Sequence, residues 1–147
     1  MLARRAAALL LFAMAACHSR VPAPAAEGSA APGPLVTSLQ VEPSPDSVRF
    51  VLQVTNASAE PVELRFNSGQ RYDFAARDDA GREAWRWSAG QGFIQVLGSE
   101  TLAPGQTVTH AESWRPGAEW RGRELTGVGR LTSSSHPAER TVRFRVP

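Results

Sequence analysis

Short runs in which apolar and polar residues alternate one for one constrain the fold of this chain most strongly. Val48, Phe50, Leu52 and Val54 alternate with neighbours that are mostly polar, which predicts a strand with one buried and one solvated face. Similar runs lie at 36–42, 62–66, 72–76, 84–87, 107–114, 127–133 and 141–146. They predict an all-β domain of seven or eight short strands without a helix. Strands at this spacing favour an antiparallel β-sandwich, with a barrel as the alternative.

Turn residues separate the runs. They lie at 56–60, 67–70, 78–81 and 103–106. Gly81 closes an Asp-Asp-Ala-Gly hairpin signal, and Pro104-Gly105 fits the centre of a type II turn. Both glycines are therefore expected to adopt positive φ, which residues with a Cβ rarely do.

Length and charge favour one neutral domain over residues 35–147. The chain has 147 residues, and the composition of 1–34 differs from that of the rest. All 16 basic residues other than histidine are arginines, set against 14 acidic residues. Removal of Arg4 and Arg5 with the first 16 residues balances these charges, which are interleaved along the chain. Nucleic-acid binding, which needs a one-sided basic surface, is not expected.

The first 17 residues are typical of an export signal. Arg4 and Arg5 precede an apolar run at 6–16 that is too short to span a bilayer. Residues 13–15, Ala-Met-Ala, fit ordinary signal cleavage. Residues 14–17, Met-Ala-Ala-Cys, resemble the bacterial lipobox, although Leu is more usual at the position of Met14. This resemblance predicts lipidation of Cys17.

Residues 18–34 are rich in Pro, Ala, Gly and Ser, which predicts a flexible tether. We therefore expect an exported protein of the bacterial cell envelope, anchored in the membrane through lipidated Cys17. A soluble periplasmic or secreted form is the alternative.

Motifs for catalysis or metal binding do not occur in the sequence. Cys17 is the only cysteine, so the domain has no disulfide, and it must be stabilised by its core. The three histidines lack zinc-binding spacing: His18, His110 and His136. Asp78 and Asp79 fit a solvated turn, and the Gly-x-Gly fragments at 90–92 and 127–129 do not stand between a strand and a helix. We expect no enzyme, no catalytic residue, no metal, no cofactor and no small-molecule substrate.

The four tryptophans fall into two pairs. Trp85 and Trp87 share one face of a predicted strand, where packing on the sheet is expected. Trp114 and Trp120 flank a polar segment at 115–119, and one of them is expected to be exposed. An exposed tryptophan is a common anchor of protein interfaces.

Three motifs, in order, resemble a known family. They are Ser-Gly-Gln-x-Tyr-Asp-Phe at 68–74, Gly-x-x-x-Trp-Arg-Trp-Ser at 81–88 and Leu-x-Pro-Gly at 102–105. Residues 48–107, which contain them together with Phe93 and Gln95, resemble the BsuPI-type intracellular proteinase inhibitor domain. The resemblance implies an immunoglobulin-like β-sandwich and inhibition of a proteinase.

An inhibitor of this kind would block the cleft of the enzyme with loops held on the rigid sandwich. The candidate loops are 67–70, 88–92 and 115–119. Their candidate partner-binding residues are Asn67, Ser68, Gly69, Gln70, Ser88, Gly90, Gly92 and Arg115, with the flanking Trp114 and Trp120. The alternative function is that of a non-inhibitory immunoglobulin-like binding or structural module of the cell envelope.

Overall fold

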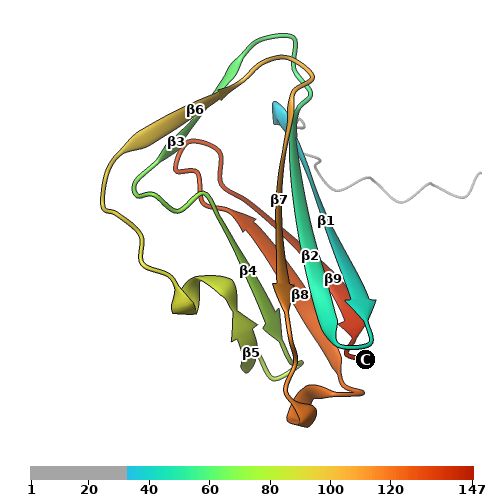
Figure 1. Ribbon diagram of the computed structural model, residues 1–147. Coiled ribbons are helices and arrows are strands. Elements are labelled where there is room, and N and C mark those ends of the chain that lie inside the picture. Colours follow the sequence, from blue (N-terminus) through green and yellow to red (C-terminus); the bar gives the residue numbers. More distant parts are fainter. Residues whose placement is uncertain (1–32) are drawn as a thin grey trace, which may run out of the picture. The chain divides into compact units, whose positions relative to one another are not determined.

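The computed structural model describes residues 33–147, so the predicted signal segment with Cys17 and most of the predicted tether lie outside the described residues. The described part forms nine strands and two short 3-10 helices (Figure 1). The strands are β1 (Leu35–Ser44), β2 (Ser47–Asn56), β3 (Val62–Phe66), β4 (Tyr72–Arg77), β5 (Glu83–Arg86), β6 (Gly98–Leu102), β7 (Thr107–Trp114), β8 (Glu124–Leu131) and β9 (Ala138–Arg145). The 3-10 helices are η1 (Trp87–Gly90) and η2 (Ala118–Trp120). Across residues 33–147, neither helical segment has the length and hydropathy that crossing a bilayer requires.

The strands pair in three antiparallel sheets. Their orders are β1-β2-β7, β5-β4-β8-β9 and β3-β6. The two larger sheets face each other, because β1 lies against β9 and β2 against β8 (Figure 1). The prediction of an all-β antiparallel sandwich is confirmed, with nine strands among the described residues where seven or eight were expected.

The core is centred on β2. Val48, Phe50, Leu52 and Val54 have no exposed surface, as their alternation predicts. Aromatic rings surround the Phe50 ring at centroid separations of 5.2 to 5.8 Å: Phe74, Trp85 and Phe144. Rings at these distances add a geometric preference to the burial of their area.

Two glycines of β8 allow the two large sheets to approach closely. A Cβ at Gly127 would lie 2.9 Å from Val41 Cγ2, and one at Gly129 would lie 2.8 Å from Leu39 Cδ1. Side chains of β1 therefore occupy the space that any larger residue of β8 would need. The Gly-x-Gly fragment at 127–129 has this packing role.

The predicted turns at Gly81 and Gly105 are confirmed. Their φ angles are +79° and +74°. Gly105 also donates a backbone hydrogen bond of 2.8 Å to Asn56 O, and Gln106 N donates one of 3.0 Å to Ala103 O. These bonds close the connection between β6 and β7 on the end of β2.

The strand expected at 84–87 ends at Arg86, and Trp87 begins η1. Two further predictions about strands differ from the structure. The strand expected at 127–133 begins at Glu124 and ends at Leu131, and the next residues run beside β3. There Ser134 N donates to Arg65 O, and Arg65 N donates to Ser135 Oγ. The second difference is β6, which is not among the predicted strands because its sequence, Gly-Ser-Glu-Thr-Leu, has no apolar alternation.

Candidate functional site

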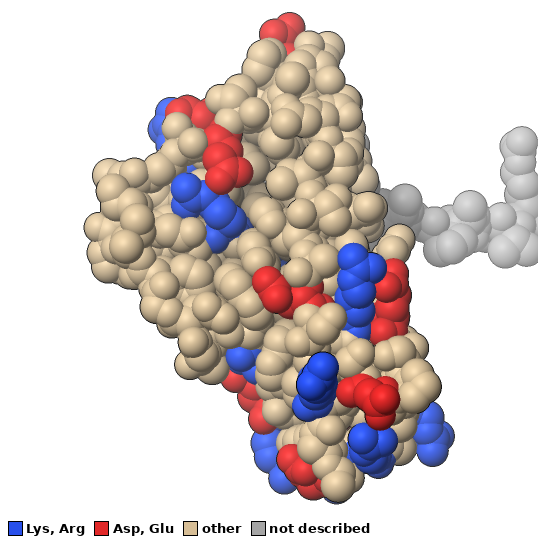
Figure 2. Space-filling view, viewed as in Figure 1, with Lys and Arg blue, Asp and Glu red and all other residues tan. Residues whose placement is uncertain are grey.

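An exposed apolar segment at residues 91–97 connects η1 to β6 (yellow in Figure 1). Ile94, Val96 and Leu97 are 72%, 51% and 79% exposed. No charged residue occurs between Arg86 and Glu100, and Figure 2 shows uncharged surface along the outer flank where this segment runs. Burial of one such side chain stabilises a complex by about 1.5–3 kcal/mol. Binding of a partner that covers the segment is therefore favourable.

The start of the segment rests on a stack of aromatic rings. The Trp87 ring stacks on the Tyr72 ring of β4 at a centroid separation of 4.5 Å, and Tyr72 stacks in turn on His110 of β7 at 4.3 Å. The Phe93 ring tilts against Trp87 at 5.7 Å. The stack therefore fixes the first part of the segment to both sheets of the sandwich.

Tyr72 and His110 have shifted acid–base properties. The Tyr72 hydroxyl donates a 2.6 Å hydrogen bond to Glu112 Oε1. Burial and the Glu112 carboxylate raise the pKa of Tyr72 to about 12, because both disfavour the phenolate. Burial lowers the pKa of His110 below its usual value, against an opposing influence of Glu100. Both groups are therefore expected to be neutral at pH 7.

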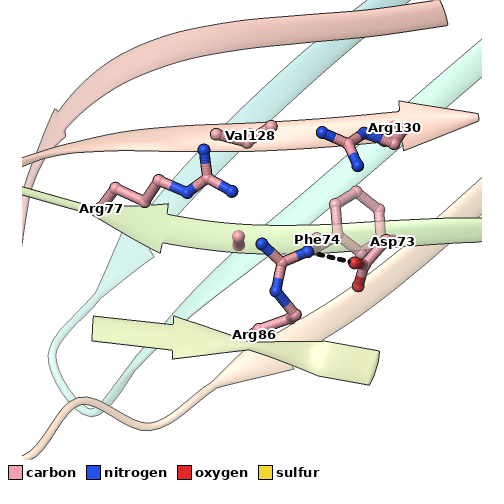
Figure 3. A pocket seen from close by; sticks show the side chains of 7 residues that line it. Asp73, Phe74, Arg77, Arg86, Val128 and Arg130 are labelled. Atoms are coloured by element: carbon pink, nitrogen blue, oxygen red, sulfur yellow. Dashed lines mark hydrogen bonds and ion pairs between the residues drawn. The ribbon is translucent and has the colours of Figure 1, made fainter. Parts of the chain in front are cut away.

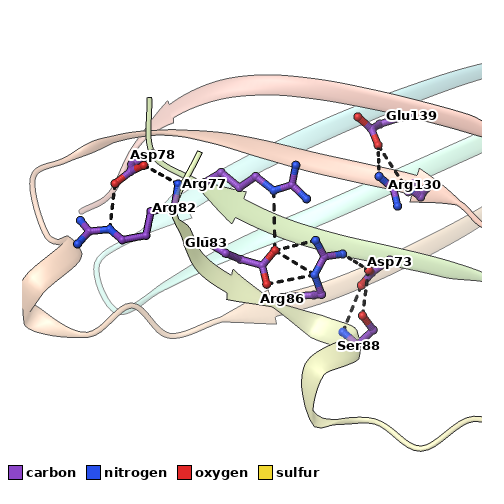
Figure 4. A network of polar contacts seen from close by, with 9 residues as sticks. All are labelled: Asp73, Arg77, Asp78, Arg82, Glu83, Arg86, Ser88, Arg130 and Glu139. Atoms are coloured by element: carbon purple, nitrogen blue, oxygen red, sulfur yellow. Dashed lines mark hydrogen bonds and ion pairs between the residues drawn. The ribbon is translucent and has the colours of Figure 1, made fainter. Parts of the chain in front are cut away.

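A buried carboxylate holds η1. Asp73, on the opposite face of β4 from Tyr72, is 6% exposed. Ser88 donates to it from its backbone N at 3.2 Å and from Oγ at 2.9 Å, and Arg86 donates at 2.5 Å (Figure 4). Hydrogen bonds to Glu83 and Asp73 raise the pKa of Arg86 above its usual value, although burial opposes this. Asp73 thereby positions the helical turn from which the exposed segment emerges.

The cavity beside this ion pair is too small to be a ligand site. It lies between the Asp73–Arg86 pair, Arg77 and Arg130 (Figure 3). Its volume of about 10 Å³ is at the lower limit for a single water molecule. The described residues also contain no group of three His, Cys, Asp or Glu side chains that could hold a metal ion.

The middle of the segment is tied to the loop between β3 and β4. Gly69 N donates a 2.8 Å hydrogen bond to Ile94 O. A Cβ at Gly69 would lie 3.1 Å from Ile94 Cγ1, so the absence of a side chain lets the two backbones meet.

The end of the segment enters a paired strand. Gly98 lies opposite Phe66 in the β3–β6 register. Arg71 reinforces this join, because its guanidinium donates to Ser68 O at 2.8 Å and to Glu100 Oε1 at 2.6 Å. The same guanidinium lies 4.3 Å from the centroid of the Phe66 ring. Residues 95–97 therefore span two fixed points, and Val96 and Leu97 stay exposed between them.

This arrangement can present a short apolar segment to a concave partner. Because its ends are fixed by the scaffold, the segment has less conformational entropy to lose on binding than a free loop. An open groove of about 490 Å³ beside Leu97 is lined by Phe66, Asn67, Ser134 and their neighbours. It leaves room for the walls of a partner around that side chain.

The structure brings two of the three predicted loops to this site. Asn67, Ser68, Gly69 and Gln70 lie in the loop that contacts Ile94, and Ser88, Gly90 and Gly92 belong to η1 and the start of the exposed segment. Arg115 and residues 116–119 follow β7 and lead into η2, at the lower end of Figure 1. Among the described residues no hydrogen bond or ion pair joins them to the other two loops.

The expectation that Trp114 or Trp120 is exposed is wrong. The two residues are 6% and 8% exposed and belong to the core. Trp114 stacks on Trp85 at 6.0 Å, and Arg82 and Arg123 cover the Trp120 ring at 4.8 and 5.5 Å. These tryptophans are therefore unavailable as surface anchors.

Within the exposed segment, the sequence-based candidates end at Gly92 and omit the exposed residues that follow. Phe-Ile-Gln-Val-Leu at 93–97 is a short apolar run of the kind that also occurs in buried strands. The feature of the sequence that could have indicated an exposed segment is its position between Gly92 and Gly98, in a stretch without charged residues.

Comparison with known proteins gives one match that carries an assignment. Among curated proteins none matches this sequence. A sporulation control protein from Bacillus subtilis, Spo0M, is similar in structure with a TM-score of 0.42 and 14% identity, over 78% of this chain and 49% of that one. This chain thus spans about half the length of that protein. The model of the BsuPI family, described as intracellular proteinase inhibitor, matches residues 35–139. The chain belongs to the BsuPI family.

Proposed function

We propose that this domain inhibits a proteinase by presenting residues 91–97 to the active-site cleft of the enzyme. One observation carries the proposal: an exposed aliphatic segment is fixed before, within and after its length by the scaffold. Membership of the BsuPI family supports the class of partner. The proposal assigns no catalytic residue to the domain.

The physical basis of the proposed inhibition is a loop that the scaffold holds in place and that exposes apolar side chains. Burial of Ile94, Val96 and Leu97 in a cleft would stabilise the complex. The bonds from Gly69 to Ile94 and from Arg71 to Glu100 limit the entropy lost on binding. Proteinases bind extended segments, and 91–97 has no regular secondary structure.

The test is an inhibition assay with the full chain, purified in detergent, against serine, cysteine and metallo-proteinases. Val96→Asp should weaken inhibition, because a charge would enter the apolar contact without a partner. Val36→Asp is the matched control, since Val36 is 55% exposed and Val96 51%, and Val36 lies on β1 away from the site. Equal inhibition by both variants would contradict the role of the segment. Failure to inhibit any class would favour a non-inhibitory binding module instead.

We also propose that the protein is exported and anchored in the cell envelope through lipidated Cys17. The charged start, the short apolar run and the single cysteine at the end of that run support this address. The family is described as intracellular. The proposal for this protein's location rests instead on its own first 17 residues.

Incorporation of radiolabelled palmitate tests the anchor. The wild-type protein should carry label in the membrane fraction, and Cys17→Ser should carry none. An unlabelled wild type in the periplasm or medium would indicate the soluble exported form. An unlabelled cytoplasmic protein of full length would contradict export altogether.

A further inference from the structure

We propose that the target proteinase has an apolar primary specificity pocket and that Leu97 fills this pocket. The inference rests on the proposed function. It adds the chemical character of the enzyme's specificity pocket and the residue that binds there. It commits to one partner class, a proteinase that prefers aliphatic side chains over arginine, lysine or acidic ones.

Leu97 is the side chain of the segment that is freest to enter a pocket. It is 79% exposed, more than Ile94 or Val96. Ile94 is held on Gly69 through its carbonyl, and its Cγ1 lies over the space that a Cβ of Gly69 would take. Leu97 directly precedes the paired Gly98, so its backbone is fixed on one side, while the exposed residue itself lines the open groove.

The charge distribution argues against a pocket that selects charged side chains. A pocket with a carboxylate at its base selects arginine or lysine, and a basic pocket selects an acid. The segment from Trp87 to Ser99 offers neither. The charged residues near its end pair with each other, because Arg71 and Glu100 form a 2.6 Å ion pair. Glu63 and Arg65, which line the groove together with Leu97, form a 3.0 Å ion pair. An aliphatic side chain is what this loop presents.

The experiment compares inhibition constants of the full chain against three proteinases, which cleave after aliphatic, basic and acidic residues. The wild type should inhibit the first enzyme best. Leu97→Ala should weaken that inhibition about 30-fold, as truncation of a buried hot spot does. Leu97→Arg should weaken it by more than about 100-fold, because the pocket cannot solvate the guanidinium. Leu97→Arg should in turn gain inhibition of the enzyme that cleaves after basic residues.

Val36→Arg is the control for an added charge, and thermal unfolding checks that each variant is folded. Leu97 makes few contacts in the free domain, so its variants should unfold within a few degrees of the wild type. The inference is overturned, and the proposed function stands, if the wild type inhibits only the enzymes with charged specificity or if Leu97→Arg inhibits as the wild type does. Loss of the proposed function has another signature, which is no inhibition of any enzyme by the wild type.

Discussion

Residues 91–97 and residues 115–120 both lie between strands, and they place their large apolar side chains in opposite ways. In the second segment Trp120 turns into the core, between Arg82 and Arg123, and the polar residues face water. In the first, Phe93 turns inward while Ile94, Val96 and Leu97 face water. An apolar side chain that a loop buries stabilises its own fold, whereas one that a braced loop exposes is available to a partner.

The largest expected effect lies in the buried segment. Trp120→Ala should lower the free energy of unfolding by about 3–5 kcal/mol, because it leaves a cavity and removes both cation–π contacts. Urea denaturation measures the loss. Leu97→Ala is the matched control and should change stability by less than about 0.5 kcal/mol. Equal losses in the two variants would break the contrast between the segments.

The next largest effect on stability is expected at Asp73, which holds η1 before the exposed segment. Asp73→Asn should destabilise the domain by about 2 kcal/mol, because hydrogen bonds to a buried charge are exchanged for weaker ones. The amide of Ser88 should then exchange its hydrogen faster. Glu83→Gln is the comparison, since Glu83 also contacts Arg86 but is more exposed than Asp73. An unchanged Ser88 amide in Asp73→Asn would contradict the positioning role.

A smaller effect on stability, with a visible effect on binding, is expected at the other end of the segment. Arg71→Ala should cost about 1 kcal/mol of stability. It should also weaken inhibition about tenfold, because a looser join with β6 leaves more entropy to be lost on binding. Arg49→Ala, which removes an exposed ion pair between β2 and Glu42 of β1, should do neither. Unchanged inhibition constants in Arg71→Ala would show that the loop needs no brace.

The last effect is absent at neutral pH. Tyr72 is the only tyrosine in the chain, so tyrosinate absorbance reports on it alone. Its pKa in the fold, about 12, lies above the unfolded value of 10.0. The neutral phenol therefore stabilises the fold below pH 10, and this contribution is lost as the pH rises from about 10 through about 12. Glu112→Gln should move the titration midpoint down, whereas a midpoint near 10 in the wild type would mean that the aromatic stack is open.

The strands with apolar alternation and the glycine turns could be predicted from local sequence patterns. Val48 to Val54 alternate because one face of β2 meets the opposing sheet, and Gly81 and Gly105 lie where the turn needs positive φ. Such features depend on neighbours within a few residues, so the sequence reveals them. β6 depends on β3, whose paired residues lie 32 to 40 positions earlier in the sequence, and its own residues show no alternation.

The candidate site depended on where side chains point, which local patterns do not determine. The polar segment beside Trp114 and Trp120 predicted exposure, but η2 turns the second ring inward under two arginines. Trp87 was expected to continue a strand, whereas the bonds from Ser88 to Asp73 begin a helical turn there. This turn directs 91–97 outward, and the contact between Gly69 and Ile94 is made only in the folded chain.

The bracing of residues 91–97 has a consequence for where such a domain can work. Hydrogen bonds from Gly69, Arg71 and Ser88, and the stack of Trp87 on Tyr72, hold the loop. None of these contacts involves sulfur, and the one cysteine of the chain precedes the domain. A loop held in this way keeps its shape in reducing and oxidising surroundings alike, so the same scaffold can serve on either side of a membrane.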